Sequence, residues 1–128
     1  MILLVDDNAL FAEMMREIVI PFGFALGWCE SGEEAIEIIR ARPDVRLVFM
    51  DYALPGGMSG VRAASEIRKL PPPGGTVPII GLTGGHSYDD LELRAAAQFA
   101  AEIQKPILPR DIEDLIIRYI RRWPAITG

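Results

Sequence analysis

Four short, largely apolar runs and a weaker fifth strand-like segment, residues 101–104, alternate with amphipathic segments along this chain of 128 residues. The first run, Ile2 to Val5, contains no polar residue, which is typical of a strand that is covered on both faces. It is followed, over residues 9–19, by apolar residues at helical spacing. Alternation of strands and helices favours a parallel sheet with helices packed on both sides. We therefore predict a doubly wound α/β fold with five parallel strands.

The elements can be placed along the chain by their patterns. Strands are expected at residues 2–5, 22–29, 47–50, 77–82 and 101–104, and helices at 9–19, from a Ser31 capping box onward, at 59–70, at 89–97 and around 112–123. Prolines and glycines at 71–75 end the third helix. A chain of this length fits one domain, so residues 1–128 are expected to form a single unit with a core of about 2–123.

The composition excludes several classes of protein. A net charge of −5 argues against broad contact with phosphates, so no direct binding to nucleic acid is expected. The single cysteine, Cys29, rules out a disulfide framework, is expected in the core, and favours a reducing compartment such as the cytoplasm. No apolar run reaches the ~18 residues of a membrane span and no signal peptide is recognisable, so no membrane association is expected.

Polar residues suited to chemistry follow the predicted strands directly. Asp6 and Asp7 end the first strand, Asp51 ends the third, Thr83 follows the fourth and Lys105 follows the fifth. Right-handed crossovers put the carboxyl ends of parallel strands on one edge of the sheet. Ligands of open α/β sheets bind outside that edge. We therefore expect these side chains to converge on one shallow pocket.

The three carboxylates of this pocket would repel one another and raise one another's pKa values. A hard divalent cation relieves that repulsion, and oxygen ligands with room for water suit Mg²⁺. Lys105 adds a positive charge on the other side, and Thr83 adds a hydroxyl donor. Such groups can place a phosphoryl group beside a metal ion. The simpler interpretation is that Asp7 or Asn8 only caps the helix at 9–19.

With these residues in this order, the sequence resembles the receiver domains of two-component response regulators. The likeness covers Ile2 to about Trp123 and rests on Asp6-Asp7, on Asp51 with Pro55 four residues on, on Thr83 at the end of an apolar run, and on Lys105-Pro106. Each piece alone is weak, but all of them at strand ends form a strong signal. The resemblance implies a flavodoxin-like (βα)5 fold with its five parallel strands in the order 2-1-3-4-5.

By this resemblance, Asp51 is the nucleophile that takes a phosphoryl group from a phosphohistidine. The metal site would consist of Asp6, Asp7, Asp51 and the backbone carbonyl of Ala53. Asp7 would bind Mg²⁺ directly, and Asp6 would act through water or through a contact outside the direct ligands. Such a domain is not an enzyme in the ordinary sense, because it catalyses only its own phosphorylation and dephosphorylation.

The resemblance also implies partners. Lys105 and Thr83 would each bind a phosphoryl oxygen, and the added charge would pull Thr83 inward as a switch. The phosphodonor would be a histidine kinase or a histidine phosphotransfer protein, docked on the first helix at Phe11 and Met15. A downstream protein target would bind the face formed by residues 99–123. Both a stand-alone regulator and a receiver from a longer protein fit the sequence, which names no kinase, signal, output or oligomeric state.

Two residues depart from the pattern usual in receivers. Gln98 stands where a glycine often ends the fourth helix. A left-handed backbone there would strain glutamine, so we predict a rearranged helix end. Glu102 stands where an aromatic residue often rotates inward with the threonine, and a carboxylate is not expected to enter an apolar slot. The usual coupling from the threonine to an aromatic residue is therefore called into question.

Several single residues carry smaller expectations. Ala53 and Gly85, two residues after the aspartate and the threonine, offer no polar group to steer water at a phosphoryl group, so self-dephosphorylation is expected to take hours. His86 is expected on the surface, and Trp28 and Trp123 are expected to serve packing alone.

Three other functions share parts of this pattern. A phosphatase of the haloacid dehalogenase type would need a second acid two residues after Asp51, where Ala53 stands. A flavodoxin-like cofactor site would place a phosphate where Asp6-Asp7 would repel it. A receiver-shaped module that binds proteins without phosphorylation is the remaining alternative, favoured by Glu102 and opposed by the intact acids with Lys105.

Overall fold

The computed structural model describes residues 1–84 and 90–121. The strands are β1 (Ile2–Val5), β2 (Leu26–Cys29), β3 (Leu47–Asp51), β4 (Ile79–Thr83) and β5 (Ala101–Gln104), and the helices are α1 (Ala9–Val19), α2 (Gly32–Ala41), α3 (Gly60–Ile67), α4 (Leu91–Ala97) and α5 (Pro109–Ile116). Short 3-10 turns follow α1 and precede β4, and a π-helical turn, Ile117–Arg121, extends α5.

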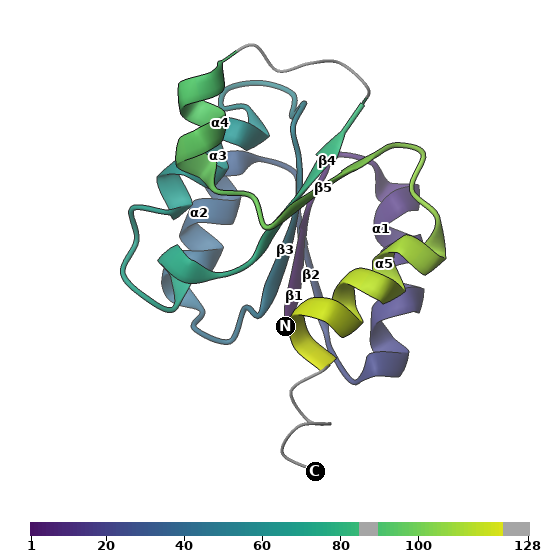
Figure 1. Ribbon diagram of the computed structural model, residues 1–128. Helices are drawn as coiled ribbons and strands as arrows, with labels where there is room; N and C mark the ends of the chain where they lie inside the picture. The colour runs from purple at the N-terminus through teal and green to yellow at the C-terminus, as the bar shows by residue number, and fades with distance from the viewer. Residues whose placement is uncertain (85–89, 122–128) are drawn as a thin grey trace.

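The five strands form one parallel sheet in the order β2-β1-β3-β4-β5, which confirms the predicted topology. Helices α1 and α5 cover one face, and α2, α3 and α4 cover the other (Figure 1). The register pairs Val5 with Met50, Asp51 with Leu82 and Thr83 with Gln104. The strands therefore end at the same edge of the sheet.

The sheet separates two hydrophobic cores. Leu3 and Val5 of β1 face the core under α2, α3 and α4, whereas Ile2 and Leu4 face the core under α1 and α5. All four side chains are fully buried. Successive strand residues point to opposite faces, so a strand covered on both sides must be apolar throughout, as the run Ile2–Val5 is. Cys29 is buried as expected.

Polar side chains cap the helices that follow the strands. Asn8 accepts a hydrogen bond from the backbone of Phe11 and caps α1, and the Ser31 hydroxyl accepts one from Glu34 at the start of α2, as the capping pattern predicted. Because Asn8 caps α1, the acid that precedes it, Asp7, is not the cap. The simpler interpretation of that acid as a helix cap is thus wrong.

Several predicted boundaries are wrong. The fourth strand was expected to begin at residue 77, but β4 begins at Ile79. Phe22 was expected to begin the second strand, but it lies in a 3-10 turn that continues α1. Pro21 is the second residue of that turn, Ile20–Phe22, and Gly23, with a φ of 88°, ends it in the left-handed region. The third helix was expected to reach Leu70, but α3 ends at Ile67.

The end of α4 also differs from the prediction. Gln98 itself adopts the left-handed conformation, with a φ of 50°, so the helix end is not rearranged. The guanidinium group of Arg68 donates hydrogen bonds of 2.8 Å to the carbonyl oxygens of both Ala97 and Gln98. These contacts from Arg68, the residue that follows α3, hold the turn in place and offset the strain that a non-glycine residue bears there.

Within the described residues, none of the helices is both long and apolar enough to cross a membrane.

Candidate functional site

Three carboxylates meet at the carboxyl edge of the sheet. One oxygen from each of Asp6, Asp7 and Asp51 lies within 4.8 Å of the others. Asp6 is fully buried, Asp51 is 4% exposed, and Asp7 is open to solvent. The carboxyl ends of β1 and of its neighbour β3 supply these groups, as the strand-end pattern predicted.

The backbone around the acids fixes their orientation. The N–H of Asn8 donates to the Asp6 carboxylate at 2.9 Å, and the N–H of Ala53 donates to Asp51 at 3.2 Å. The indole N–H of Trp28 donates to the backbone carbonyl of Asp6 at 2.7 Å. Each bond satisfies a polar group that would otherwise be buried without a partner.

Lys105 reaches into this cluster from the loop after β5. Its Nζ lies 3.1 Å from a carboxylate oxygen of Asp51 and 3.4 Å from one of Asp6. The backbone N–H of Lys105 donates to the carbonyl oxygen of Thr83 at 2.8 Å, which connects the loop that carries the lysine to the end of β4. The ammonium group of Lys105 is therefore paired with both buried carboxylates, and either carboxylate without such a partner would be a costly buried charge.

The environment shifts the pKa values of the bridged groups. Burial raises the pKa of Asp51, and the hydrogen bond from Lys105 only partly opposes that rise, while the charge of Asp6 adds to it. Burial alone would lower the pKa of Lys105, but the hydrogen bond to Asp51 and the charges of both acids outweigh it and raise the pKa. The surroundings therefore disfavour the ionised form of Asp51, and a second cation beside it would oppose this effect.

The oxygen donors suit a hard divalent cation. Asp6, Asp7 and Asp51 offer carboxylate oxygens and no softer ligand, and the exposure of Asp7 leaves room for water ligands. Such a ligand set fits Mg²⁺. The buried acids also carry more negative charge than Lys105 alone can balance, so a cation there would be stabilising.

The structure brings four of the predicted site residues together: Asp6, Asp7, Asp51 and Lys105. Thr83 lies at the same edge, one residue beyond the Leu82 that pairs with Asp51, and Ala53 lies two residues after Asp51. The roles of these residues in metal and phosphoryl binding stay predictions. Gly85, His86 and Trp123 lie outside the described residues.

Sequence reasoning missed two residues that build this site. A Cβ atom on Gly60 would lie 1.8 Å from the backbone oxygen of Asp51, so only glycine lets α3 begin this close to the end of β3. Trp28 was expected to serve packing alone, but its indole is 37% exposed and hydrogen-bonds the backbone of Asp6. Neither role has a local signal in the sequence, because both depend on contacts between elements.

A groove of about 240 Å³ adjoins the acidic cluster. It is lined by Asp6, Asn8, Phe11, Met14, Lys105, Pro106 and Ile107, between α1 and the loop after β5. Met15, predicted to dock a partner, is fully buried in the core, so its place in that prediction is wrong. Met14 and Phe11 are the residues of α1 that line the groove.

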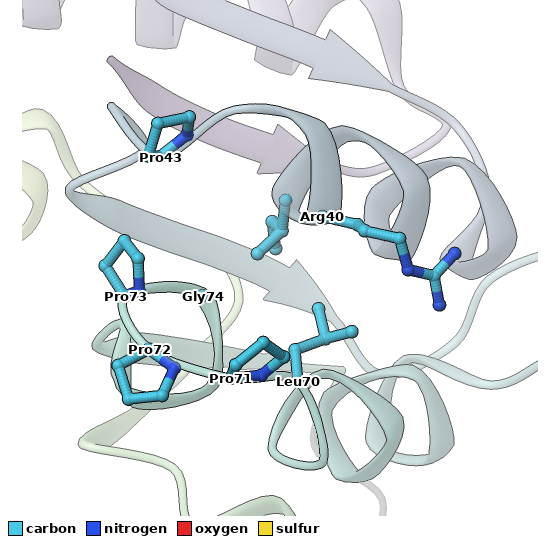
Figure 2. A pocket seen from close by; sticks show the side chains of 8 residues that line it. Arg40, Pro43, Leu70, Pro71, Pro72, Pro73 and Gly74 are labelled. Atoms are coloured by element: carbon cyan, nitrogen blue, oxygen red, sulfur yellow. The ribbon is translucent and has the colours of Figure 1, made fainter.

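A smaller hollow of about 100 Å³ lies at the opposite edge of the sheet, where the strands begin. Figure 2 shows Pro43 and the prolines of the 71–73 loop facing one another across it, with Arg40 and Leu70 at one side. Among the described residues that line it, only Arg40 is charged.

Fold and site together define a flavodoxin-like α/β domain with an acidic pocket at its carboxyl edge. The profile of the family described as the response regulator receiver domain matches residues 2–117. This chain therefore belongs to the response regulator receiver family, whose members are signalling domains of two-component systems.

Relatives of known identity agree with this assignment. The DNA-binding response regulator MtrA of Mycolicibacterium paratuberculosis is 32% identical over 94% of this chain and 51% of its own length. The chain thus spans about half the length of the curated relatives it matches.

Two solved receiver structures are similar to this chain. The receiver domain of the sensor histidine kinase PA1611 from Pseudomonas aeruginosa PAO1 has a TM-score of 0.79 and 26% identity, and the match covers 94% of this chain and 96% of that one. That structure holds a magnesium ion in its active-site cleft. A CheY-like receiver from Methanospirillum hungatei JF-1 has a TM-score of 0.81 and 26% identity, over 94% and 93% of the two chains.

Proposed function

We propose that Asp51 accepts a phosphoryl group from a phosphohistidine and that the domain thereby switches a protein-binding face. The observation that carries this proposal is the buried carboxylate of Asp51, 3.1 Å from the ammonium group of Lys105 and within 4.8 Å of two further acids. A carboxylate that lies between an ammonium group and further carboxylates able to bind a metal ion can act as a nucleophile toward phosphorus. The phosphodonor would be a histidine kinase or a histidine phosphotransfer protein.

The transfer would need little covalent work from the protein. An oxygen of Asp51 forms a bond to phosphorus while the bond from phosphorus to the histidine nitrogen breaks, and the imidazole leaves with that electron pair and takes up a proton. Negative charge spreads over the phosphoryl oxygens, where Lys105 can neutralise one and the Thr83 hydroxyl can donate to another. When bound by Asp6, Asp7, Asp51 and the carbonyl of Ala53, Mg²⁺ would neutralise part of the same charge.

The groove beside the pocket supports a docking place for the phosphodonor. Phe11, Met14 and Ile107 give it an apolar wall, and Asp6 and Lys105 lie where it meets the pocket. An amphipathic helix that carries the phosphohistidine would bury its apolar face there and present the imidazole to Asp51.

Intact mass after incubation with Mg²⁺ and acetyl phosphate tests the proposal. The wild-type protein should gain the mass of one phosphoryl group. Asp51→Asn should gain none, whereas Asp114→Asn, which removes an exposed acid from α5, should gain as much as the wild type. A gain in Asp51→Asn equal to that of the wild type, or no gain in any of the three proteins, would contradict the proposal.

The phosphoryl group should then persist for hours. Ala53 is exposed and its methyl group cannot orient an attacking water molecule, which is the property on which rapid hydrolysis depends. Loss of the added mass from the isolated protein in Mg²⁺ measures the lifetime. Complete decay within seconds would show that another group directs the water.

A receiver-shaped interaction module that needs no phosphorylation is the second candidate. Glu102, which stands where an aromatic residue is common, supports it, because its carboxylate is held by Arg94 and Tyr52 rather than left free to exchange with a ring. The mass experiment separates the two candidates. If the wild type gains no phosphoryl group and binds no Mg²⁺, the second candidate becomes the better one.

A further inference from the structure

Tyr52 follows Asp51 directly and sends its side chain across the neighbouring strand. The ring is 8% exposed and lies over Gly81 of β4. A Cβ atom at position 81 would come within 2.5 Å of a ring carbon and 2.7 Å of the hydroxyl oxygen. Glycine in the middle of β4 therefore makes room for this ring.

The hydroxyl of Tyr52 ends at the edge strand of the sheet. It donates a hydrogen bond to the carboxylate of Glu102 on β5. The same carboxylate accepts hydrogen bonds of 2.6 and 2.7 Å from the guanidinium group of Arg94 on α4. Three residues from β3, β5 and α4 are thus joined in one hydrogen-bonded chain, which we call the edge cluster.

Packing supports the same connection. The rings of Tyr52 and Phe99 are tilted against each other, with centroids 4.9 Å apart, and Phe99 lies in the segment between α4 and β5. Tyr52 therefore contacts both Glu102, which binds Arg94 of α4, and the segment that connects α4 to β5.

The backbone of Tyr52 is fixed close to Asp51. Its N–H donates to the carbonyl oxygen of Leu82 at 3.0 Å, and its carbonyl oxygen accepts a bond of 2.9 Å from Gly60. A shift of the Asp51 backbone must move this peptide, and the stiff aromatic side chain carries the movement to Glu102. A packed and hydrogen-bonded connection of this kind can have two discrete arrangements.

We propose that the edge cluster holds α4 in its present position while Asp51 is unmodified, and that a phosphoryl group on Asp51 releases it. The chain of contacts runs through Tyr52, so Glu102 acts as an acceptor and no aromatic residue at position 102 has to move. This inference rests on the proposed function, because it assigns the route by which modification of Asp51 reaches the α4 and β5 face.

The proposal has a reciprocal consequence. If a ligand at Asp51 releases the edge cluster, then breaking the cluster at its far end must strengthen that ligand's binding, since coupling between two sites is symmetric. Arg94 lies on α4 and binds the carboxylate of Glu102, so it is the residue at which to test this.

Beryllium fluoride with Mg²⁺, a non-covalent mimic of a phosphoryl group on a carboxylate, is the probe, and calorimetry gives its affinity. Arg94→Gln and Tyr52→Phe should bind it at least three times more tightly than the wild type. Two controls should bind as the wild type does. Arg40→Gln breaks an exposed ion pair on α2, and Arg42→Gln breaks the exposed pair with Asp44 that follows α2. Unchanged or weaker binding in both cluster variants would overturn the proposal.

Hydrogen exchange tests whether the edge cluster holds α4, and this test does not depend on phosphorylation. Without any ligand, the amides of α4 should exchange faster in Tyr52→Phe and Arg94→Gln than in the two controls, because α4 has lost its anchor. Equal exchange in all of these proteins would overturn the proposal as well. If the wild type binds no beryllium fluoride and gains no phosphoryl mass, the proposed function fails, and the exchange result alone then decides whether the edge cluster holds α4.

Discussion

Asp51 and Glu102 are each paired with a cation, and their surroundings act on them in opposite ways. Asp51, in the acidic pocket, lies 3.1 Å from Lys105, yet burial raises its pKa and the charge of Asp6 adds to the rise. Glu102, in the edge cluster, is also partly desolvated, but the hydrogen bonds from Arg94 and Tyr52 outweigh this and lower its pKa. The fold therefore disfavours the ionised form of Asp51 and favours that of Glu102.

The difference separates a reactive group from a structural one. Asp51 shares its single cation with a second buried acid, so its charge is poorly compensated until a further cation or a bond to phosphorus relieves it. Glu102 has donors from two directions and acts as a fixed joint between β5 and α4. We expect substitutions in the two regions to differ in both size and sign.

The largest effect is expected at Gly60, beside the acidic pocket. In Gly60→Ala, the new methyl group would meet the backbone of Asp51, which cannot rotate away, so the free energy of unfolding should fall by about 3 kcal/mol. Gly84→Ala is the matched control, because a Cβ atom there meets nothing within 4 Å. Urea unfolding measures both. A cost for Gly60→Ala no greater than that of the control would show that α3 can shift freely away from β3.

The next effect is expected at Gly81, beside the edge cluster, where the obstacle is a side chain. Gly81→Ala should cost about 2 kcal/mol through overpacking against Tyr52. In a Tyr52→Leu background the same substitution should cost less than about 0.5 kcal/mol, since the clashing ring is gone. Urea unfolding of the four proteins gives this double-mutant cycle. Additive costs would contradict the packing of Tyr52 over Gly81.

The acidic pocket could be predicted from the sequence because its residues are fixed by strand ends. Asp6, Asp51 and Lys105 each lie at the end of a predicted strand, and parallel strands with right-handed crossovers must bring such positions together. The sheet order came from the resemblance, and the structure confirms it. Here one local pattern is enough to place a side chain.

The edge cluster could not be predicted in this way, because it depends on which side chains meet across strands. Tyr52 reaches Glu102 only because Gly81 lies between them, and no periodic pattern records such a pairing. Gln98 was misjudged for the same reason. Its left-handed turn is held by Arg68, which lies thirty residues earlier in the chain. Such contacts override the local backbone preference on which the prediction rested.

Asp51→Asn should raise the free energy of unfolding at neutral pH in the absence of Mg²⁺, by about 1 kcal/mol. The folded pKa of Asp51 lies above its unfolded value of 3.8, so stability falls as the pH rises through this interval and stays lower above it. The advantage of the asparagine variant should therefore vanish below that interval, where Asp51 is protonated in both states. Urea unfolding in EDTA at several pH values checks this, and an asparagine variant less stable than the wild type at neutral pH would contradict it.

Added Mg²⁺ should reverse that order. At ten times its dissociation constant, a ligand that binds only the folded state adds about 1.4 kcal/mol. The wild type should gain this stability, and Asp51→Asn should gain less, because it has lost one carboxylate of the ligand set. An equal gain in both proteins would place the cation elsewhere.

The smallest effect, of opposite sign, is expected from the same kind of substitution at Glu102. Glu102→Gln should lower the free energy of unfolding at neutral pH by about 0.5 kcal/mol, because the partly exposed pair with Arg94 is screened by solvent. The folded pKa of Glu102 lies below its unfolded value of 4.5, so its contribution is present above that value and is lost as the pH falls through the folded pKa. The difference from the wild type should therefore shrink in acid, and it should also shrink in 1 M salt. Glu37→Gln, which breaks the exposed pair with Arg40 on α2, should change nothing measurable. If Glu102→Gln were instead more stable than the wild type, as is expected of Asp51→Asn, the two carboxylates would not differ in the way that their surroundings predict. The edge cluster would then not stabilise the fold.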